Sequence, residues 1–379
     1  MKRIANLLQI ITGIVFVFSG FVKAVDPVGT QIKFEDYFIA LGLEFFIPAA
    51  LFFSFVLNAA ELILGIMLIL NIFRKQALWG SILLMAFFTP LTLWLAVDNP
   101  VSDCGCFGDA IILTNWQTFF KNIVILGFIL FALLFGEKKQ LRNFFSSSVL
   151  LLTVIVLSFG FEMYNYRHLP MFDFRPFKEG ADIKAKIIIP KDAPREEYEI
   201  RLFYKNKKTG ERKEFTMQNY PQDEKIWAFD TTINVLVKEG YEPPIHDFEL
   251  TGLNGKNLTG QILNETGYLL IMISFDFDKA DGKDLSKVGE YSEFCVKEDI
   301  PFYIFTSSSK NALEQFLSGY KFEGDLCTGD KTMLKTIVRS NPAWVLMKDG
   351  HIIKKWHFRD VPDIKKLKKE LQTSSVLIF

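Results

Sequence analysis

Five long apolar runs constrain the fold of this chain more than any other feature. They cover about residues 5–24, 47–71, 77–97, 116–136 and 147–165. An apolar α-helix of about 20 residues is long enough to cross the hydrocarbon core of a bilayer. The first run follows Met-Lys-Arg and lacks a clean small-x-small cleavage site, so we predict a retained span rather than a secretory signal. The first four runs then form a compact membrane bundle, and the fifth carries the chain to a soluble part.

The overall composition hides two different halves. Hydrophobic residues make up 50% of the chain, but residues 166–379 read as a charged, mixed sequence. The 43 basic and 43 acidic residues cancel, whereas nucleic-acid-binding domains favour a clustered basic face, so we expect no nucleic acid partner. The predicted order is a transmembrane four-helix bundle at 1–136, a fifth transmembrane helix at 137–165, a β-rich segment at 166–240 and an α/β domain at 241–379.

The basic residues of the loops predict the orientation. They occur at every second boundary, as Lys2 and Arg3, then Arg74 and Lys75, then Lys138, Lys139 and Arg142. Loops rich in Lys and Arg stay in the cytoplasm. The N-terminus is therefore expected in the cytoplasm, and the third loop and the C-terminal half outside it. We predict a multi-pass protein of the bacterial inner membrane, with the lipid bilayer as its first partner.

Cys104 and Cys106 lie in the third loop, in the segment SDCGCFGD, and no Lys or Arg occurs from Gln76 to Phe120. Outside the cytoplasm, disulfides form and persist. The Cα atoms of residues i and i+2 lie roughly 5.5–7 Å apart, near the long end of what a disulfide tolerates, and strained exposed disulfides are the labile kind. The pair is therefore a candidate redox couple, although Asp103 and Asp109 are expected to raise the thiol pKa by like-charge repulsion.

Two charged residues of the spans are further candidates. Glu61 lies near the middle of the second span, and an intramembrane carboxyl is a functional-site hypothesis by default. The alternative for Glu61 is a protonated side chain bonded to a neighbouring helix. Lys23, near Asp26 and Pro27 at the end of the first span, is interpreted as part of an interfacial ion pair or helix stop, or as one wall of a site opposite the cysteines.

Beyond residue 166 the pattern changes to short strands and helices. Strands are expected at 185–190, 198–204, 214–219 and 233–238, which form the β-rich segment. A layered α/β series follows, with strands at 268–275 and 301–308, helices at 285–297, 310–320, 334–340 and 361–372, and a hairpin at 342–356.

Two more cysteines and four histidines lie in this half or at its start. Cys295 falls on an apolar helical face and is expected to be buried, whereas Cys327 lies in a polar turn, where it can be exposed; a pairing between the two stays open. The histidines share no close spacing, and no metal site is predicted from them. They are His168, His246, His351 and His357.

The C-terminal pattern resembles a thioredoxin-like domain over roughly 240–372. PPIHDFELTGLNGKNLT is similar to that family's entry segment, and SNPAWVLMKDGHIIKKW to its proline and hairpin, which places Pro342 at the cis-proline position. The family's Cys-x-x-Cys belongs after the strand at 268–275, where this chain has DFDKADGKD instead. The resemblance therefore implies the fold without its usual redox chemistry.

The membrane half resembles the DoxX/MauE-like family over about 1–135. GIVFVFSGFVKAVDPVGT and the third-loop CGCFGD carry this likeness. It implies a role in disulfide formation or maturation of exported proteins and supports only Cys104 and Cys106 as site residues. The tandem of a bundle and a thioredoxin-like domain also resembles bacterial vitamin K epoxide reductase homologues, which points by analogy to a quinone as cofactor; their second membrane cysteine pair is absent here.

Three functions stay open on the sequence. The first is a membrane thiol-disulfide oxidoreductase, or an accessory maturation factor, in which Cys104 and Cys106 exchange disulfides with an exported client or a periplasmic redox partner and Glu61 is a proton site. The second is a non-enzymatic assembly or scaffold protein with the cysteines as a structural clip. In the third the cysteines bind a metal with ligands from another chain, because two thiolates are an incomplete set for zinc.

Overall fold

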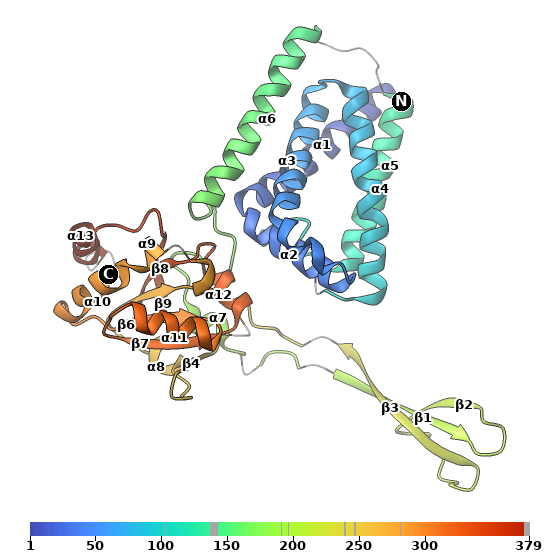
Figure 1. Ribbon diagram of the computed structural model, residues 1–379. Coiled ribbons are helices and arrows are strands. Elements are labelled where there is room, and N and C mark those ends of the chain that lie inside the picture. The colour runs from blue at the N-terminus through green and yellow to red at the C-terminus, as the bar shows by residue number, and fades with distance from the viewer. Residues whose placement is uncertain are drawn as a thin grey trace. The chain divides into compact units, whose positions relative to one another are not determined.

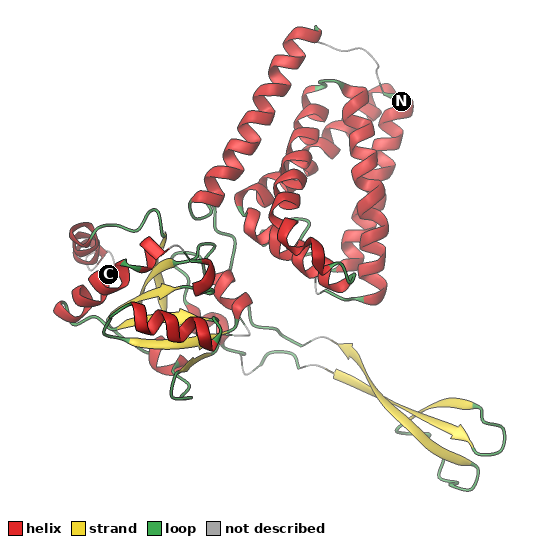
Figure 2. Cartoon of the chain, viewed as in Figure 1, coloured by secondary structure: helices red, strands yellow, loops and turns green. Residues whose placement is uncertain are grey.

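The computed structural model describes residues 1–101, 103–136, 143–190, 192–195, 197–238, 240–245, 248–280 and 282–374. The chain divides into two compact units, Met1–Ala181 together with Glu249–Phe379, and Asp182–Phe248. The first unit passes from an all-helical part to a mixed one, which Figure 2 shows by colour.

Five helices have the length and composition of membrane spans, which confirms the five predicted runs and identifies a multi-pass membrane protein (Figure 1). They are α1 (Lys2–Val25), the segment Glu44–Leu70 that contains α3 (Ala50–Leu70), α4 (Arg74–Asp98), α5 (Asn115–Phe135) and α6 (Phe144–Arg167). The loop with Lys138, Lys139 and Arg142 lies outside the described residues. The orientation drawn from it therefore stays a prediction.

Helices α1 and α3 pack at close range, and glycines on both helices, Gly13, Gly20 and Gly65, allow it. A Cβ atom at Gly20 would lie 2.5 Å from the backbone nitrogen of Leu62, so only glycine fits there. Membrane helices approach closely where small residues meet, because lipid supplies no hydrophobic drive for their association. One turn further on, this contact places Lys23 of α1 against Glu61 of α3.

The first loop contains a helix that the apolar pattern did not predict. α1 ends at Val25, and the Asp26 side chain accepts a 2.9 Å hydrogen bond from the Gly29 backbone N–H at the start of α2 (Pro27–Ala40). Pro27 fits the first helical position, where no N–H partner is needed. α2 packs against α3 and therefore returns the chain toward the bundle.

The C-terminal part of the first unit is built on a six-stranded sheet of order β4-β7-β6-β5-β8-β9. The strands are β4 (Leu250–Gly252), β5 (Tyr268–Ile273), β6 (Phe302–Thr306), β7 (Asp325–Gly329), β8 (Ala343–Lys348) and β9 (His351–His357). β5 pairs in parallel with β6, and β6 with β7, whereas β8 runs antiparallel to β5 and to β9. The Asn341–Pro342 peptide bond before β8 is cis.

Helices cover this sheet. They are α8 (Thr259–Leu263), α9 (Gly282–Leu285), α10 (Lys287–Lys297), α11 (Lys310–Gly319), α12 (Lys331–Ile337) and α13 (Ile364–Ser374). Leu270, Met272 and Trp344 of the sheet share one buried cluster with side chains of α10, α11 and α13, and the alternate residues Leu269 and Ile271 are buried as well. A sheet buried on both faces needs such nearly continuous apolar strands.

The second unit holds a three-stranded antiparallel sheet of order β2-β1-β3. Its strands are β1 (Glu197–Asn206), β2 (Arg212–Thr216) and β3 (Trp227–Lys238), which confirms three of the four strands predicted there. The fourth, at 185–190, is wrong, because Asp182 caps a short helix, α7 (Ile183–Ile187), by accepting from the Ala185 N–H. A side-chain cap gives the backbone a helical alternative that an apolar run alone does not reveal.

Two further predictions need correction. Cys327 lies in strand β7 with none of its surface exposed, not in a polar turn, because neighbouring β4 and β6 cover both edges of β7. The helix predicted at 334–340 starts earlier, at Lys331, where Asp330 caps it by accepting from the Met333 N–H, and it ends at Ile337. Polar capping residues, rather than the apolar run, set both ends of this helix.

Candidate functional site

Cys104 and Cys106 border a pocket inside the helical bundle. The pocket has a volume of about 50 Å³, and its walls are mostly apolar side chains from the spans, among them Phe16, Leu84 and Ile125. Its polar lining gathers beside the two cysteines. These polar residues are Ser19, Lys23, Thr30, Lys33, Tyr37, Glu61, Lys121 and Asn122. A mainly apolar cavity with a few convergent polar groups is the usual form of a small-ligand site.

The cysteine loop is anchored to this pocket through its backbone. The Tyr37 hydroxyl of α2 donates a 2.5 Å hydrogen bond to the Cys104 carbonyl, and the Ser19 hydroxyl of α1 donates a 2.6 Å bond to the Cys106 carbonyl. Gly105 between them has a φ of +64°, a region that favours glycine. The loop is thus shaped by two helices far away in sequence, and its shape does not depend on a bond between the sulfurs.

The two sulfurs lie side by side but differ in their surroundings. Their Sγ atoms are 2.7 Å apart, and a modest approach brings them to the disulfide bond length of about 2.05 Å. Cys104 is 6% exposed, whereas Cys106 is half-buried. Cys106 is therefore the less covered residue of the two.

The surroundings also separate the two thiol pKa values. The hydrogen bond with Cys104, assisted by the charges of Lys121 and Lys23, lowers the pKa of Cys106 to about 6 against the effect of burial. The hydrogen bond to Cys106 and burial hold the pKa of Cys104 well above its usual range. A thiolate, not a thiol, is the nucleophile in disulfide exchange, so the geometry makes Cys106 the reactive sulfur.

The prediction that Asp103 and Asp109 raise the pKa of the thiols by like-charge repulsion is wrong. Asp103 forms a 2.8 Å ion pair with Lys33, and Asp109 lies 3.8 Å from the Arg339 guanidinium. Their charges are thus offset locally, whereas the hydrogen bond with Cys104 and the charge of Lys121 lower the pKa of Cys106. Opposite charges close to a thiolate favour it, which outweighs the more distant carboxylates.

Glu61 and Lys23 form a buried ion pair at the floor of the pocket. The Lys23 Nζ atom lies 2.5 Å from Glu61 Oε1, and the two side chains are only 5% and 8% exposed. The structure thus places the predicted candidate Glu61 in the same pocket as Cys104 and Cys106. Lys23 proves to be one wall of the site opposite the cysteines, and the interfacial pair expected with Asp26 does not form, because Asp26 pairs with Arg339.

Three residues of the pocket escaped the sequence reasoning. Ser19 and Tyr37 carry no distinguishing pattern, since their role is a hydrogen bond to a backbone carbonyl distant in sequence. Lys121 did leave a signal in the sequence, because it is the first basic residue after the stretch 76–120, which contains no Lys or Arg. In the structure its ammonium lies 4.4 Å from the centre of the Phe107 ring. A lone lysine within an apolar span indicates a specific partner.

The lowered pKa of Cys106 gives a testable pH profile. In the reduced protein, we expect the rate of Cys106 alkylation to rise as the pH passes through about 6 and to level off above about 7, because the thiolate fraction is then nearly complete. An ordinary thiol levels off only above about 9. Mass spectrometry of the alkylated peptide measures the rate. Lys121→Gln should move the midpoint upward, and an unchanged ordinary midpoint in the native protein would contradict the assignment.

The remaining cysteines and histidines do not add to this site. Cys295, buried on α10 as predicted, and Cys327 are both free, and burial raises the pKa of each thiol to about 12. His168 contacts Asp360, and His246 lies outside the described residues. In the part of the chain that the structure describes, no three His, Cys, Asp or Glu side chains are grouped to hold a metal ion.

Comparisons with known proteins cover two parts of the chain. The family model for methylamine utilisation protein MauE matches residues 1–135, and a domain of unknown function (DUF8463) matches residues 198–239. No curated protein and no solved structure matches the chain. The MauE match includes four of the five spans and both loop cysteines. The N-terminal part is therefore similar to MauE, and the five spans make the chain a multi-pass membrane protein.

Proposed function

We propose that this protein is a membrane thiol-disulfide oxidoreductase that acts on exported proteins through Cys104 and Cys106. The observation that carries the proposal is the asymmetry of the pair: adjacent sulfurs, one half-buried with a pKa near 6 and one buried with a raised pKa. Cys295 and Cys327, with pKa values near 12, are unsuited to compete with them. The charge pattern of the loops supports placing the pair outside the cytoplasm of the inner membrane.

In the proposed exchange, Cys106 forms the mixed disulfide with the client, and Cys104 is the leaving thiol. A client thiolate attacks Cys106 Sγ of the oxidised pair, the bond between Cys106 and Cys104 breaks, and Cys104 takes the electron pair and a proton. A second client thiolate then attacks the client sulfur of the mixed disulfide and releases Cys106 as a thiolate. The client loses two electrons and the pair gains them, and a leaving thiolate of low pKa favours the last step.

Reoxidation of the pair needs an acceptor of two electrons and two protons, and a membrane quinone is the class we propose. The apolar walls of the pocket belong to the spans, which suits a lipid-soluble molecule as the group that meets the sulfurs. A quinone supplies the capacity for both electrons and both protons. Lys23 and Lys121 carry the ammonium donors suited to bind its oxygens, and the Glu61 carboxylate, with Oε2 lacking a hydrogen-bond partner, is suited to receive a proton there.

For the C-terminal sheet domain we propose a thioredoxin-like fold that binds the client without redox chemistry. The order of β7, β6, β5 and β8, and the cis Asn341–Pro342 bond before β8, support the fold. The segment after β5, where that family carries its cysteines, begins at Asp276 and has no thiol. Such a domain holds a polypeptide near the reactive pair and leaves the exchange to the bundle.

Nothing in the geometry favours the other two readings. The loop is held by Tyr37 and Ser19 through carbonyl oxygens, so a structural clip between the sulfurs is not needed for its shape. No side chain of the described residues completes a metal site with Cys104 and Cys106.

The deciding experiment is alkylation trapping of the thiols in living cells. With Cys295 and Cys327 changed to serine, we expect Cys104 and Cys106 to be mostly oxidised and to become reduced when quinone synthesis is blocked. A pair that stays fully reduced under all conditions would rule out the oxidoreductase. A pair whose oxidation never changes would make the structural clip the better account.

A further inference from the structure

A second pocket approaches the cysteine loop from the side opposite the bundle interior. It has a volume of about 300 Å³ and is lined by charged, polar and apolar residues from four parts of the chain: α1 and α2, the cysteine loop, the segment after α6, and α12 with the residues after it. Asp103, Gly105 and Asp109 come from the cysteine loop, and Thr332, Thr336 and Arg339 from α12 and the residues after it. Lys33 and Gly105 line both this pocket and the apolar one. The two cysteines therefore lie at the boundary between two different cavities.

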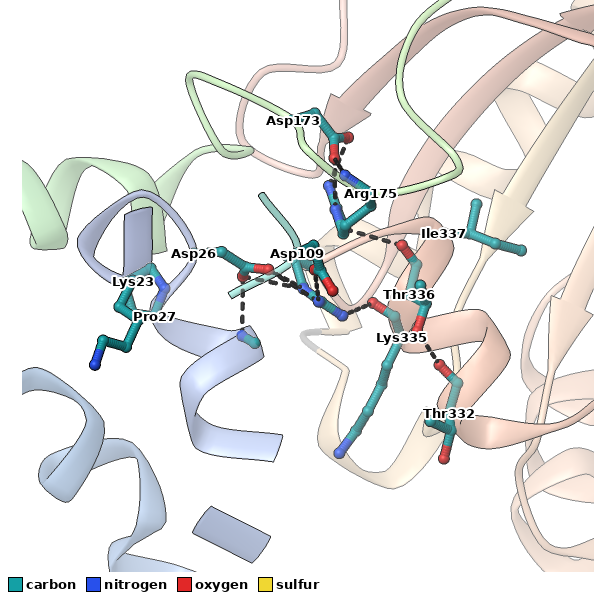
Figure 3. Close-up of polar contacts among 12 residues, drawn as sticks. Lys23, Asp26, Pro27, Asp109, Asp173, Arg175, Thr332, Lys335, Thr336 and Ile337 are labelled. Carbon is teal, nitrogen blue, oxygen red and sulfur yellow. Dashed lines mark hydrogen bonds and ion pairs between the residues drawn. The ribbon is translucent and has the colours of Figure 1, made fainter. Parts of the chain in front are cut away.

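Ion pairs of Arg339 lie at the wall of the outer pocket. Arg339, whose side chain is 5% exposed, contacts Asp26 at 2.9 Å and Asp109 at 3.8 Å. Figure 3 shows Asp26 and Asp109 close to each other, whereas the Lys23 side chain points away from both. The Arg175 guanidinium donates a 3.0 Å hydrogen bond to the Thr336 carbonyl, which attaches the segment after α6 to α12. These contacts join the sheet domain to the cysteine loop.

A partly exposed ion pair between Lys33 and Asp103 separates the two pockets. Lys33 Nζ and Asp103 Oδ2 are 2.8 Å apart, and their side chains are 29% and 22% exposed. A Cβ atom at Gly105 would lie 2.9 Å from Lys33 Cγ, so the lysine stem covers the backbone between the cysteines. A partly exposed pair of this kind contributes little stability and is easily displaced.

From this arrangement we propose that the outer pocket admits an extended, cysteine-bearing polypeptide, which reaches Cys106 by displacing Lys33 from Asp103. The inference rests on the proposed function and names the substrate's route. A polypeptide cannot enter the apolar pocket, which lies among the membrane spans. The outer pocket has both kinds of wall that an extended peptide needs: polar residues such as Thr332 and Arg339 offer partners to the backbone N–H and C=O groups, and apolar residues such as Phe172 can contact side chains.

The test compares a large and a small thiol reagent on the reduced full-length protein in lipid nanodiscs. The large reagent is an unstructured peptide with one cysteine activated as a mixed disulfide, and the small one is N-ethylmaleimide. Thr332 is exposed and lines the pocket, so Thr332→Trp obstructs it. We expect it to slow the peptide reaction at Cys106 about tenfold and to change the maleimide reaction less than about twofold. Gln315→Trp, on exposed α11 away from the pocket, is the matched control and should change neither.

A second variant tests the ion pair. In Asp103→Asn the amide oxygen can still accept from the Gly105 N–H, a 2.8 Å bond in the native protein, but Lys33 loses its charged partner. We expect a faster peptide reaction and an unchanged maleimide reaction.

The route is wrong if Thr332→Trp slows both reagents alike or neither, or if Asp103→Asn leaves the peptide reaction unchanged or slower. The reaction of the reduced protein with the two reagents does not require Cys104 and Cys106 to cycle between oxidised and reduced states in cells. The proposed route and the proposed function can therefore each be contradicted without the other.

Discussion

Replacing Cys104 with serine is expected to turn a transient complex with a client protein into a stable one. The variant keeps Cys106, whose thiolate can still form a mixed disulfide by attacking a client disulfide, but removes the neighbouring thiol that would displace the client from Cys106 again. Without a resolving thiol, such a bond persists on the timescale of uncatalysed exchange, minutes to hours. Non-reducing electrophoresis of membranes, followed by mass spectrometry of the shifted band, measures the complex and identifies the client.

Cys106→Ser is the matched variant, and it should give no complex. Both variants should fold, because Tyr37 and Ser19 hold the loop through backbone carbonyls rather than through the sulfurs. Equal trapping by the two variants would contradict the asymmetry between the cysteines. Trapping by Cys106→Ser alone would reverse their assigned roles.

Breaking the Lys23–Glu61 ion pair is expected to have the largest effect on stability. Glu61→Gln leaves the Lys23 ammonium buried without a countercharge, and removing one partner of a buried pair costs about 3–5 kcal/mol. The double variant Lys23→Met with Glu61→Met should recover most of this loss, since replacing both charges by apolar groups of similar volume is often nearly neutral. The free energy of unfolding in bicelles measures both effects.

An exposed pair supplies the control. Lys310 and Glu314 on α11 are 3.9 Å apart with side chains 87% and 65% exposed, so Glu314→Gln should change the free energy of unfolding by less than about 0.5 kcal/mol. A Glu61→Gln variant as stable as this control would show that the buried pair is not maintained in the membrane. A stable double variant that no longer reoxidises its cysteines would support the role of Glu61 as a proton site.

The sequence by itself determined the features that depend on interactions between residues close together along the chain. The five spans were predicted from the length of the apolar runs, because an apolar stretch of about 20 residues is typical of a helix that crosses a membrane. Strands β5, β6 and β8 followed from short, nearly continuous apolar runs, and buried Cys295 from the periodicity of α10. These features depend on neighbours a few residues apart, which the sequence displays directly.

The tertiary structure decided which polar groups meet. Lys23 and Glu61 are 38 residues apart, and Arg339 and Asp26 are 313 apart, so no spacing rule links them. The pKa of Cys106 reversed its expected direction first because of its hydrogen bond with Cys104, and further because Lys121 approaches from another helix while Asp103 is paired with Lys33. Charge interactions fall off with distance in space, not along the chain, so the chemistry of the pair became readable only once the helices were packed.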